Sequence, residues 1–130
     1  MWESLKGEVS LEDVSLAYDA VDAAFNKVWK EHHITWPIEE RLDVIVSGLK
    51  QKRPAEWDAL VEATSRMEVE IPPNIIEDCA ETLAALAQKY QLAIVSDAIV
   101  TPGVWLRELL AGHNICEHFS AFAFSDEVGH

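Results

Sequence analysis

Two short polar segments carry the side chains best suited to chemistry, Ser96-Asp97 and Ser125-Asp126-Glu127, and each follows an apolar run. A hydroxyl beside free backbone amides at the end of a strand can donate to one oxygen of a phosphate or carboxylate. Ser96 and Asp97 are therefore the candidate substrate-binding residues. The alternative is a serine that only satisfies the amides of a turn, because Ser and Asp are common turn formers.

Metal binding is a second chemistry to consider. Asp126 and Glu127 could hold a cation, but a solvated turn is the competing interpretation. Glu31, His32 and His33 are adjacent, and neighbouring side chains on a helix diverge, so a helix end or loop is expected there instead of a metal site. We predict no catalytic residue and no metal ligand within the chain.

The two cysteines, Cys79 and Cys116, lie far apart in the sequence and form neither a Cys-x-x-Cys pair nor a His-Cys cluster. We expect two buried, reduced thiols.

The candidate residues are positioned by a predicted strand-helix-strand unit. Residues 92–96 form a five-residue apolar run that predicts a buried strand, and residues 121–124 predict a second one. Between them, Thr101-Pro102-Gly103 begins a helix, and Gly112 is suited to a left-handed stop. Such strands are parallel, with a right-handed crossover, and ligands bind beyond their carboxyl ends. Those ends are Ser96-Asp97 and Ser125-Asp126-Glu127.

Helical patterns precede this unit. Asn74 is a candidate cap for a helix with one apolar face made of Ile76, Cys79, Leu83, Leu86 and Tyr90. Residues 10–67 predict three amphipathic helices. The first is capped by Ser10 and Asp13, and its apolar stripe consists of Leu11, Val14, Tyr18, Val21, Phe25 and Val28. That stripe fits packing within the chain and a dimer seam equally well.

The second helix begins with Pro37 in its first turn and buries Ile38, Leu42, Ile45 and Leu49; the third starts at Pro54 and buries Trp57, Leu60, Val61 and Met67. Four of the five tryptophans (Trp2, Trp29, Trp36 and Trp57) fall in this helical part. Trp36 is either a core aromatic or a wall of a pocket.

The formal net charge of the 130 residues is −13, from 23 acidic and 10 basic side chains. The electric field of this negative charge repels phosphodiester backbones and anionic membrane surfaces, so neither nucleic acid nor a membrane is expected as a partner. The opening residues have no basic segment followed by an apolar one, and the most apolar run is interrupted by Asp97. A cytoplasmic protein is expected.

The C-terminal half resembles the middle of a haloacid-dehalogenase-like (HAD) hydrolase. The order and spacing of three segments in this half are similar to those of the family's second conserved segment and of the stretch that leads to its third. The segments are Tyr90-Gln91-Leu92-Ala93-Ile94-Val95-Ser96-Asp97, then Pro102-Gly103 and Leu106-Arg107-Glu108-Leu109-Leu110, then Phe119-Ser120-Ala121-Phe122-Ala123-Phe124-Ser125-Asp126-Glu127-Val128-Gly129. The family often has Asn where this chain has Asp97.

The resemblance implies a partial HAD-like Rossmannoid α/β core at residues 71–130 and a helical cap at residues 1–70. It gives Ser96 the role of the phosphate-binding hydroxyl in a Mg²⁺-dependent phosphatase or dehalogenase that acts through an aspartyl intermediate on a small phosphorylated or halogenated substrate. The family's nucleophile belongs to an Asp-x-Asp-x-Thr/Val motif, which these residues lack. The family's lysine is expected just after His130 and its metal-binding acids further on. On this basis we expect a fragment that is inactive alone and binds no Mg²⁺ tightly.

A different class of function stays open. Two parallel strands without a central strand leave ladder edges free, and parallel sheets are normally covered on both faces. A non-catalytic α/β module that dimerises or completes another chain's sheet is therefore the alternative.

Overall fold

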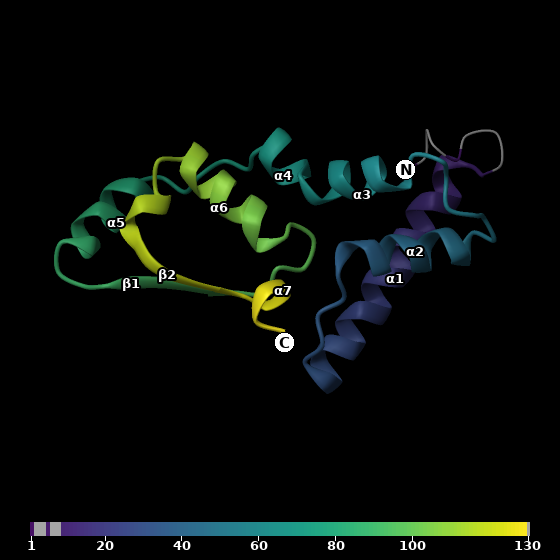
Figure 1. Ribbon diagram of the computed structural model, residues 1–130, viewed down its shortest axis with the longest axis horizontal. Helices are drawn as coiled ribbons and strands as arrows, with labels where there is room; N and C mark the ends of the chain where they lie inside the picture. The colour runs from purple at the N-terminus through teal and green to yellow at the C-terminus, as the bar shows by residue number, and fades with distance from the viewer. Residues whose placement is uncertain (2–4, 6–8, 130) are drawn as a thin grey trace. The chain divides into compact units, whose positions relative to one another are not determined.

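The computed structural model describes Met1, Leu5 and residues 9–129, which form two compact units, Met1–Thr64 and Ser65–His130. Helices dominate the chain, and its described strands form one two-stranded parallel sheet (Figure 1). The broad prediction of a helix-dominated α/β protein is confirmed. None of the helices in the described ranges has the length and apolar character needed to cross a membrane.

The first unit opens with α1 (Leu11–His32), which starts as the sequence predicted. The Ser10 hydroxyl accepts from the amide of Asp13 at 3.1 Å, and the Asp13 carboxylate accepts from the amide of Ser10 at 3.2 Å. The helix ends at His33, whose φ of 55° is left-handed and whose amide donates to the Trp29 carbonyl. The reciprocal pairing of Ser10 and Asp13 at the start of the helix satisfies two backbone amides that would otherwise have no partner within the helix.

The core of the first unit forms where α1 packs against α2 (Ile38–Gly48), and α3 (Trp57–Ser65) contributes to the same cluster. Its buried members are Leu5, Val21, Leu42, Ile45, Val46, Trp57 and Leu60. The predicted stripe of α1 is buried at Val14, Val21 and Phe25, but Leu11 is 62% exposed. The prediction for Leu11 is wrong because helical spacing shows which residues share a face but does not show whether another element packs against the first turn.

Trp36 belongs to this core, since it packs against the cluster and its ring meets the edge of Phe25 at 6.1 Å between centroids. Pro37 is the N-cap of α2 and not part of its first turn. Trp2 lies outside the described residues. Met67, predicted to be buried, is 46% exposed.

An arginine is buried in the first unit, which the apolar pattern did not predict. Arg41 is 6% exposed, forms an ion pair with Asp22 of α1, and lies 4.9 Å from the centre of the Phe25 ring. A buried guanidinium needs a charged or aromatic partner, and Arg41 has both. The pair therefore ties α2 to α1.

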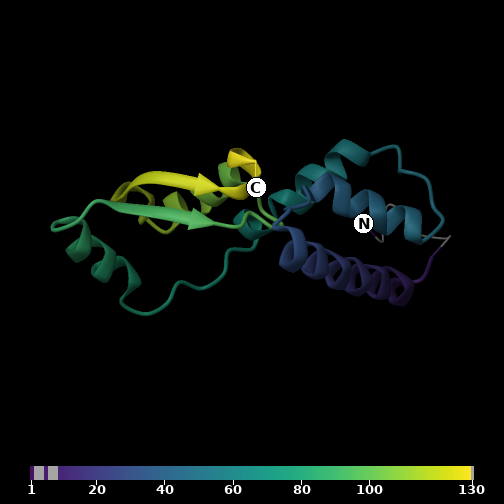
Figure 2. The same cartoon turned by 90° about the horizontal axis from the view of Figure 1, so that it is seen from below.

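The second unit contains α4 (Met67–Glu70), α5 (Cys79–Ala87), β1 (Leu92–Ser96), α6 (Gly103–Gly112), η2 (Cys116–His118), β2 (Phe119–Phe124) and α7 (Ser125–Val128). The strands β1 and β2 run side by side in the same direction (Figure 2), and Ser96 at the end of β1 pairs with Phe124 at the end of β2. The predicted parallel strand-helix-strand unit is confirmed.

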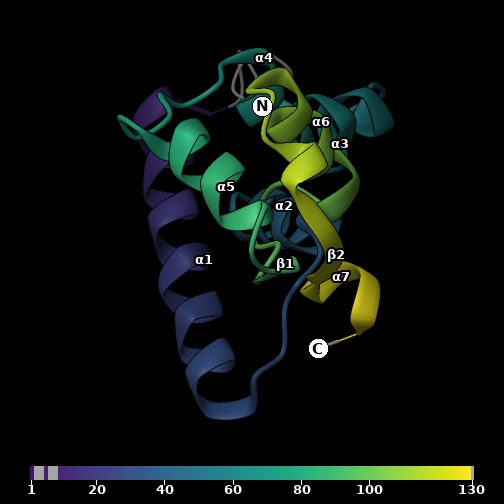
Figure 3. The ribbon, with the colours of Figure 1, turned by 90° about the vertical axis from the view of Figure 1, so that its left-hand side faces the viewer.

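One face of the sheet is covered by α6, which lies along one side of the strands (Figures 1 and 3). The stacked rings of Phe122 and Phe124 lie beneath Arg107 of this helix, at 5.0 and 4.9 Å from its guanidinium carbon. Val95 of β1 is 85% exposed. The prediction of a fully buried strand is wrong, because within the described second unit burial alternates along β1 and only one face is covered.

Helix α5 differs most from the sequence-based prediction. It begins at Cys79 after Asp78, which adopts a left-handed φ of 60°, and not at Asn74. Ile76 and Tyr90, expected on a buried face, are 80% and 63% exposed. Cys79 and Cys116 are free but half-buried, not buried as expected.

The stop of α6 also differs from the prediction. Gly112 is the last helical residue and has an ordinary backbone, whereas Asn114 takes the left-handed conformation with a φ of 56°. Asparagine tolerates this conformation better than most residues other than glycine.

Candidate functional site

The carboxyl ends of the two strands form a small open pocket of about 240 Å³. Its walls come from β1, β2 and the turn of α7, and they consist of Val95, Ser96, Asp97, Ala123, Ser125 and Val128. The structure thus brings both sequence-predicted residues, Ser96 and Asp97, to one pocket, and adds Ser125 to them. Its position follows from the parallel register, since Ser125 comes directly after the partner of Ser96.

Ser125 fixes the backbone that follows Ser96. It is 7% exposed, and its hydroxyl oxygen accepts from the buried amide of Ala98 at 2.9 Å. Ala98 is itself buried. Without this acceptor the amide would be left without a partner, at a cost of about 1–3 kcal/mol. Sequence reasoning placed Ser125 at a strand end but did not reveal this contact, which joins residues 27 positions apart.

Asp126 binds the start of α6. Its two carboxylate oxygens accept from the amide of Gly103 at 3.2 and 3.1 Å. A carboxylate is favoured at a helix N-terminus, where open amides carry partial positive charge. The local sequence offers α6 no side-chain cap, since Pro102 precedes it. The cap comes instead from a residue 23 positions later.

Glu127 pairs with Arg107 of α6 through two bonds of 2.5 and 2.7 Å. Its hydrogen bond to Arg107 is the main reason that the pKa of Glu127 lies below its ordinary value. The same bond raises the pKa of Arg107. Asp126 and Glu127 are exposed, as expected for a solvated turn, and their carboxylates also bind Gly103 and Arg107 of the same unit.

The electrostatics of the pocket are mixed. Ser96 and Ser125 contribute hydroxyl groups, and Asp97 contributes an exposed carboxylate. No lysine or arginine of the described residues lines it. The hydroxyl donors suit an oxyanion, whereas the carboxylate of Asp97 opposes one.

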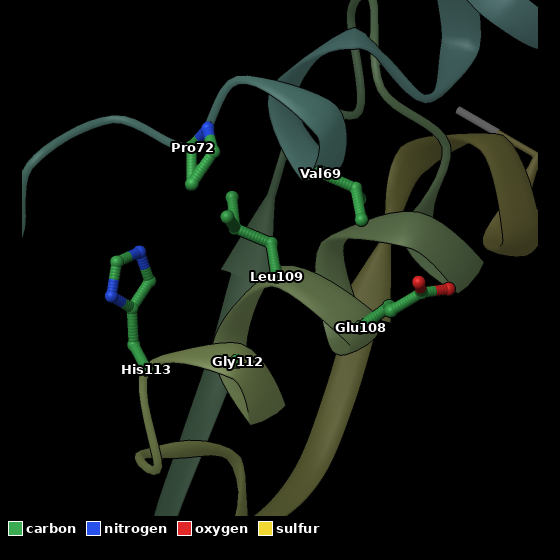
Figure 4. A pocket seen from close by; sticks show the side chains of 6 residues that line it. All are labelled: Val69, Pro72, Glu108, Leu109, Gly112 and His113. Atoms are coloured by element: carbon green, nitrogen blue, oxygen red, sulfur yellow. The ribbon is translucent and has the colours of Figure 1, made fainter.

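A second pocket of the same unit, of about 210 Å³, lies away from the strand ends between α4 and α6 (Figure 4). His113 and Glu108 stand on opposite sides of it, with Leu109 between them. Glu108 also binds Arg66 at 3.3 Å. The two titratable groups are therefore not arranged as an acid-base pair, and we assign this pocket no chemistry.

The remaining predicted candidates form no site in the structure. His32 and His33 lie at the exposed C-terminal end of α1, where a helix-end role was expected, and His33 is the cap residue. Across the described ranges, no group of three His, Cys, Asp or Glu side chains is placed to hold a metal ion. His130 lies outside those ranges.

Comparisons of this chain with protein-family models, with curated proteins and with solved structures found no match.

Proposed function

We propose that this chain supplies a helical cap and the phosphate-binding part of the α/β core of a HAD-like hydrolase, a Mg²⁺-dependent phosphatase that acts through an aspartyl intermediate in the intact enzyme. The main support is the pocket at the strand ends, where Ser96 sits at the end of a parallel strand with its hydroxyl available. Phosphate esters are favoured over halogenated acids as substrates because they are the commonest substrates of the family that the sequence resembles.

On this proposal Ser96 binds and orients one phosphate oxygen. A hydroxyl donor fixed at a strand end lowers the cost of orienting the phosphoryl group before reaction, and its hydrogen bond strengthens as charge builds on that oxygen.

The described residues do not fit a magnesium centre. Asp126 and Glu127 are held by Gly103 and Arg107, and the described residues provide no cluster of three metal-binding side chains. No Asp-x-Asp motif occurs in the 130 residues. We therefore derive no metal-dependent step from this chain, and on the proposal the nucleophile and the Mg²⁺ ligands come from outside the 130 residues.

The proposal is tested by phosphate binding. Titration of the ¹⁵N-labelled chain with inorganic phosphate is expected to shift the amide resonances at residues 96–98, and Ser96→Ala is expected to weaken binding at least tenfold, since a hydrogen bond to a charged group contributes about 1.5–3 kcal/mol. Ser120→Ala is the matched control, because this hydroxyl bonds the Leu92 carbonyl at the other end of the sheet.

Asp97→Asn provides a second check, because removal of a negative charge from the pocket should tighten phosphate binding. If phosphate shifts no resonance near Ser96 in either the wild-type chain or this variant, Ser96 does not have the proposed role. Sequencing of the DNA that flanks the reading frame tests the remainder: an Asp-x-Asp-x-Thr/Val motif upstream and a lysine with an acidic pair downstream are expected.

A binding module is the second candidate, and one observation favours it. The uncovered sheet face presents Ala93, Val95 and Ala121, all exposed, and the segment before α5 adds Ile71 and Ile76, each 80% exposed. Apolar surface of this kind marks interaction sites in soluble proteins. A homodimer, or a sheet completed by another chain, would cover it.

Light scattering combined with an apolar dye separates the two candidates. A monomer at micromolar concentration that binds no dye would argue strongly against the binding module. A stable dimer in which Val95→Lys restores the monomer would favour it instead.

A further inference from the structure

Ser125 has a hydrogen-bonding capacity that its contact with Ala98 does not use. A serine hydroxyl has one proton to donate and two lone pairs that accept. The bond from Ala98 occupies a lone pair and leaves the proton free to rotate. Among the described residues, no acceptor for that proton is found.

Ser125 lies at the pocket that contains the predicted site residues. Ser125 is more than nine-tenths buried, yet it is one of the residues that line the pocket shared with Ser96 and Asp97. The parallel register pairs Ser96 with Phe124, so the two serines lie at adjacent strand ends. Two hydroxyl donors from neighbouring strands therefore border the same space.

The acceptor role and the donor role reinforce each other. Because Ala98 holds the Ser125 oxygen in place, only rotation of the O–H bond remains to be fixed when the hydroxyl binds a ligand, which reduces the entropic cost of binding. The same contact fixes the backbone two residues after Ser96. A change at Ser125 should thus disturb both its own donation and the placement of Ser96.

We propose that Ser125 is a second ligand-binding residue of the Ser96 pocket, which donates its hydroxyl proton to a second oxygen of a tetrahedral oxyanion and holds the loop after Ser96 through Ala98. This inference rests on the proposed function, because it assigns a further residue to the same phosphate site. The ligand class is a phosphate group with at least two unesterified oxygens.

The first experiment is amide hydrogen exchange in the full chain without ligand. Ser125→Ala removes the acceptor, so the amide of Ala98 should exchange about tenfold faster, as expected for loss of one buried hydrogen bond. Ser125→Cys keeps most of the volume but offers only a weak acceptor and should behave similarly. Ser125→Thr retains the hydroxyl and should exchange like the wild type.

The second experiment repeats the inorganic phosphate titration on these variants. Ser125→Ala and Ser125→Cys should weaken phosphate binding about tenfold, and Ser125→Thr should restore it, because only threonine keeps the charge-assisted donor. Unchanged amide resonances far from the pocket would establish that each variant is folded.

The outcomes separate this inference from the proposed function. Weaker binding in Ser96→Ala together with wild-type binding in Ser125→Ala would overturn the role of Ser125 and leave that of Ser96 intact. Absence of phosphate binding in the wild type would remove both. Unchanged exchange at Ala98 in Ser125→Ala would refute the loop-holding part on its own.

Discussion

At the scale of single residues, Gly103 at the start of α6 lies close to the end of β2. A Cβ atom added to Gly103 would lie 2.5 Å from Cδ2 of Phe124, 2.8 Å from its Cβ and 2.7 Å from a carboxylate oxygen of Glu127. Phe124 is 1% exposed, so its ring has little room to move. Glycine is needed at position 103 for space and not for backbone conformation.

The first prediction follows from this contact. Gly103→Ala should lower the free energy of unfolding of the second unit by about 1–3 kcal/mol, because overpacking forces a buried ring or the backbone to shift. Urea denaturation followed by circular dichroism measures the change. Gly112→Ala, in the same helix, is the control, since no atom lies within 4 Å of its added Cβ and alanine favours the helix. Equal stability of Gly103→Ala and wild type would contradict the packing described.

The second prediction concerns pH. The bond with Arg107 lowers the pKa of Glu127 in the folded state below its ordinary value of 4.5. A carboxyl group with a lowered folded pKa stabilises the protein above its unfolded pKa and loses this contribution as pH falls through the folded value. The wild type should therefore lose part of its stability in acid below about pH 4.5.

In Glu127→Gln the loss at acid pH should be smaller, because that variant lacks the titrating group. The measurement is the urea midpoint at several pH values between neutrality and acid. Since the pair is partly exposed, the effect should also shrink in high salt. Parallel pH profiles for wild type and variant would show that the ion pair does not contribute.

At this scale the sequence placed the candidate residues at the strand ends but did not predict their contacts. Ser96 and Asp97 were identified because strand ends are where such sheets bind ligands. The roles of Ser125, Asp126 and Glu127 could not be predicted, since their partners Ala98, Gly103 and Arg107 lie 20 to 27 positions away. Only the folded register brings them together.

At the scale of elements, the start of α1 is specified by residues three positions apart. The Ser10 hydroxyl and amide both donate to the Asp13 carboxylate, at 2.6 and 3.2 Å, and these bonds lower the pKa of Asp13. The first turn of the longest helix is thus stabilised locally. Local specification explains why this helix start could be predicted.

The third prediction concerns removal of the Ser10 cap. Ser10→Ala should reduce the stability of the first unit by about 1 kcal/mol, a typical value for loss of an N-cap serine. Ser15→Ala, at an exposed position within the same helix, is the control and should be neutral or slightly stabilising. Thermal unfolding monitored by circular dichroism compares the two variants. An equal change in both would indicate that the cap contributes nothing.

The start of α5 shows the limit of local prediction. Asn74 is a suitable cap residue, and the apolar residues that follow have helical spacing. The helix nevertheless begins at Cys79, and none of its residues is buried. An amphipathic pattern fixes which face would be buried, but the start of the helix depends on whether another element covers that face.

At the scale of the whole molecule, the 130 residues carry a formal net charge of −13. This charge bears directly on the candidate site, because a phosphate must approach a negatively charged protein and a pocket that contains Asp97. Affinity for inorganic phosphate should consequently rise with ionic strength, which screens the repulsion.

The fold class was predictable from the sequence because the order of helices and strands determines it. The uncovered sheet face was not predictable, because its coverage depends on which elements surround the sheet.

The turn after β2 has an implication for how this sequence can change over evolutionary time. Three consecutive residues, 125–127, each bind a different group in the stretch from position 98 to position 107. A substitution at any one of them leaves a distant partner without its hydrogen bond, so single substitutions at these positions should be selected against. We expect changes in this triplet to be inherited together with compensating changes in that stretch.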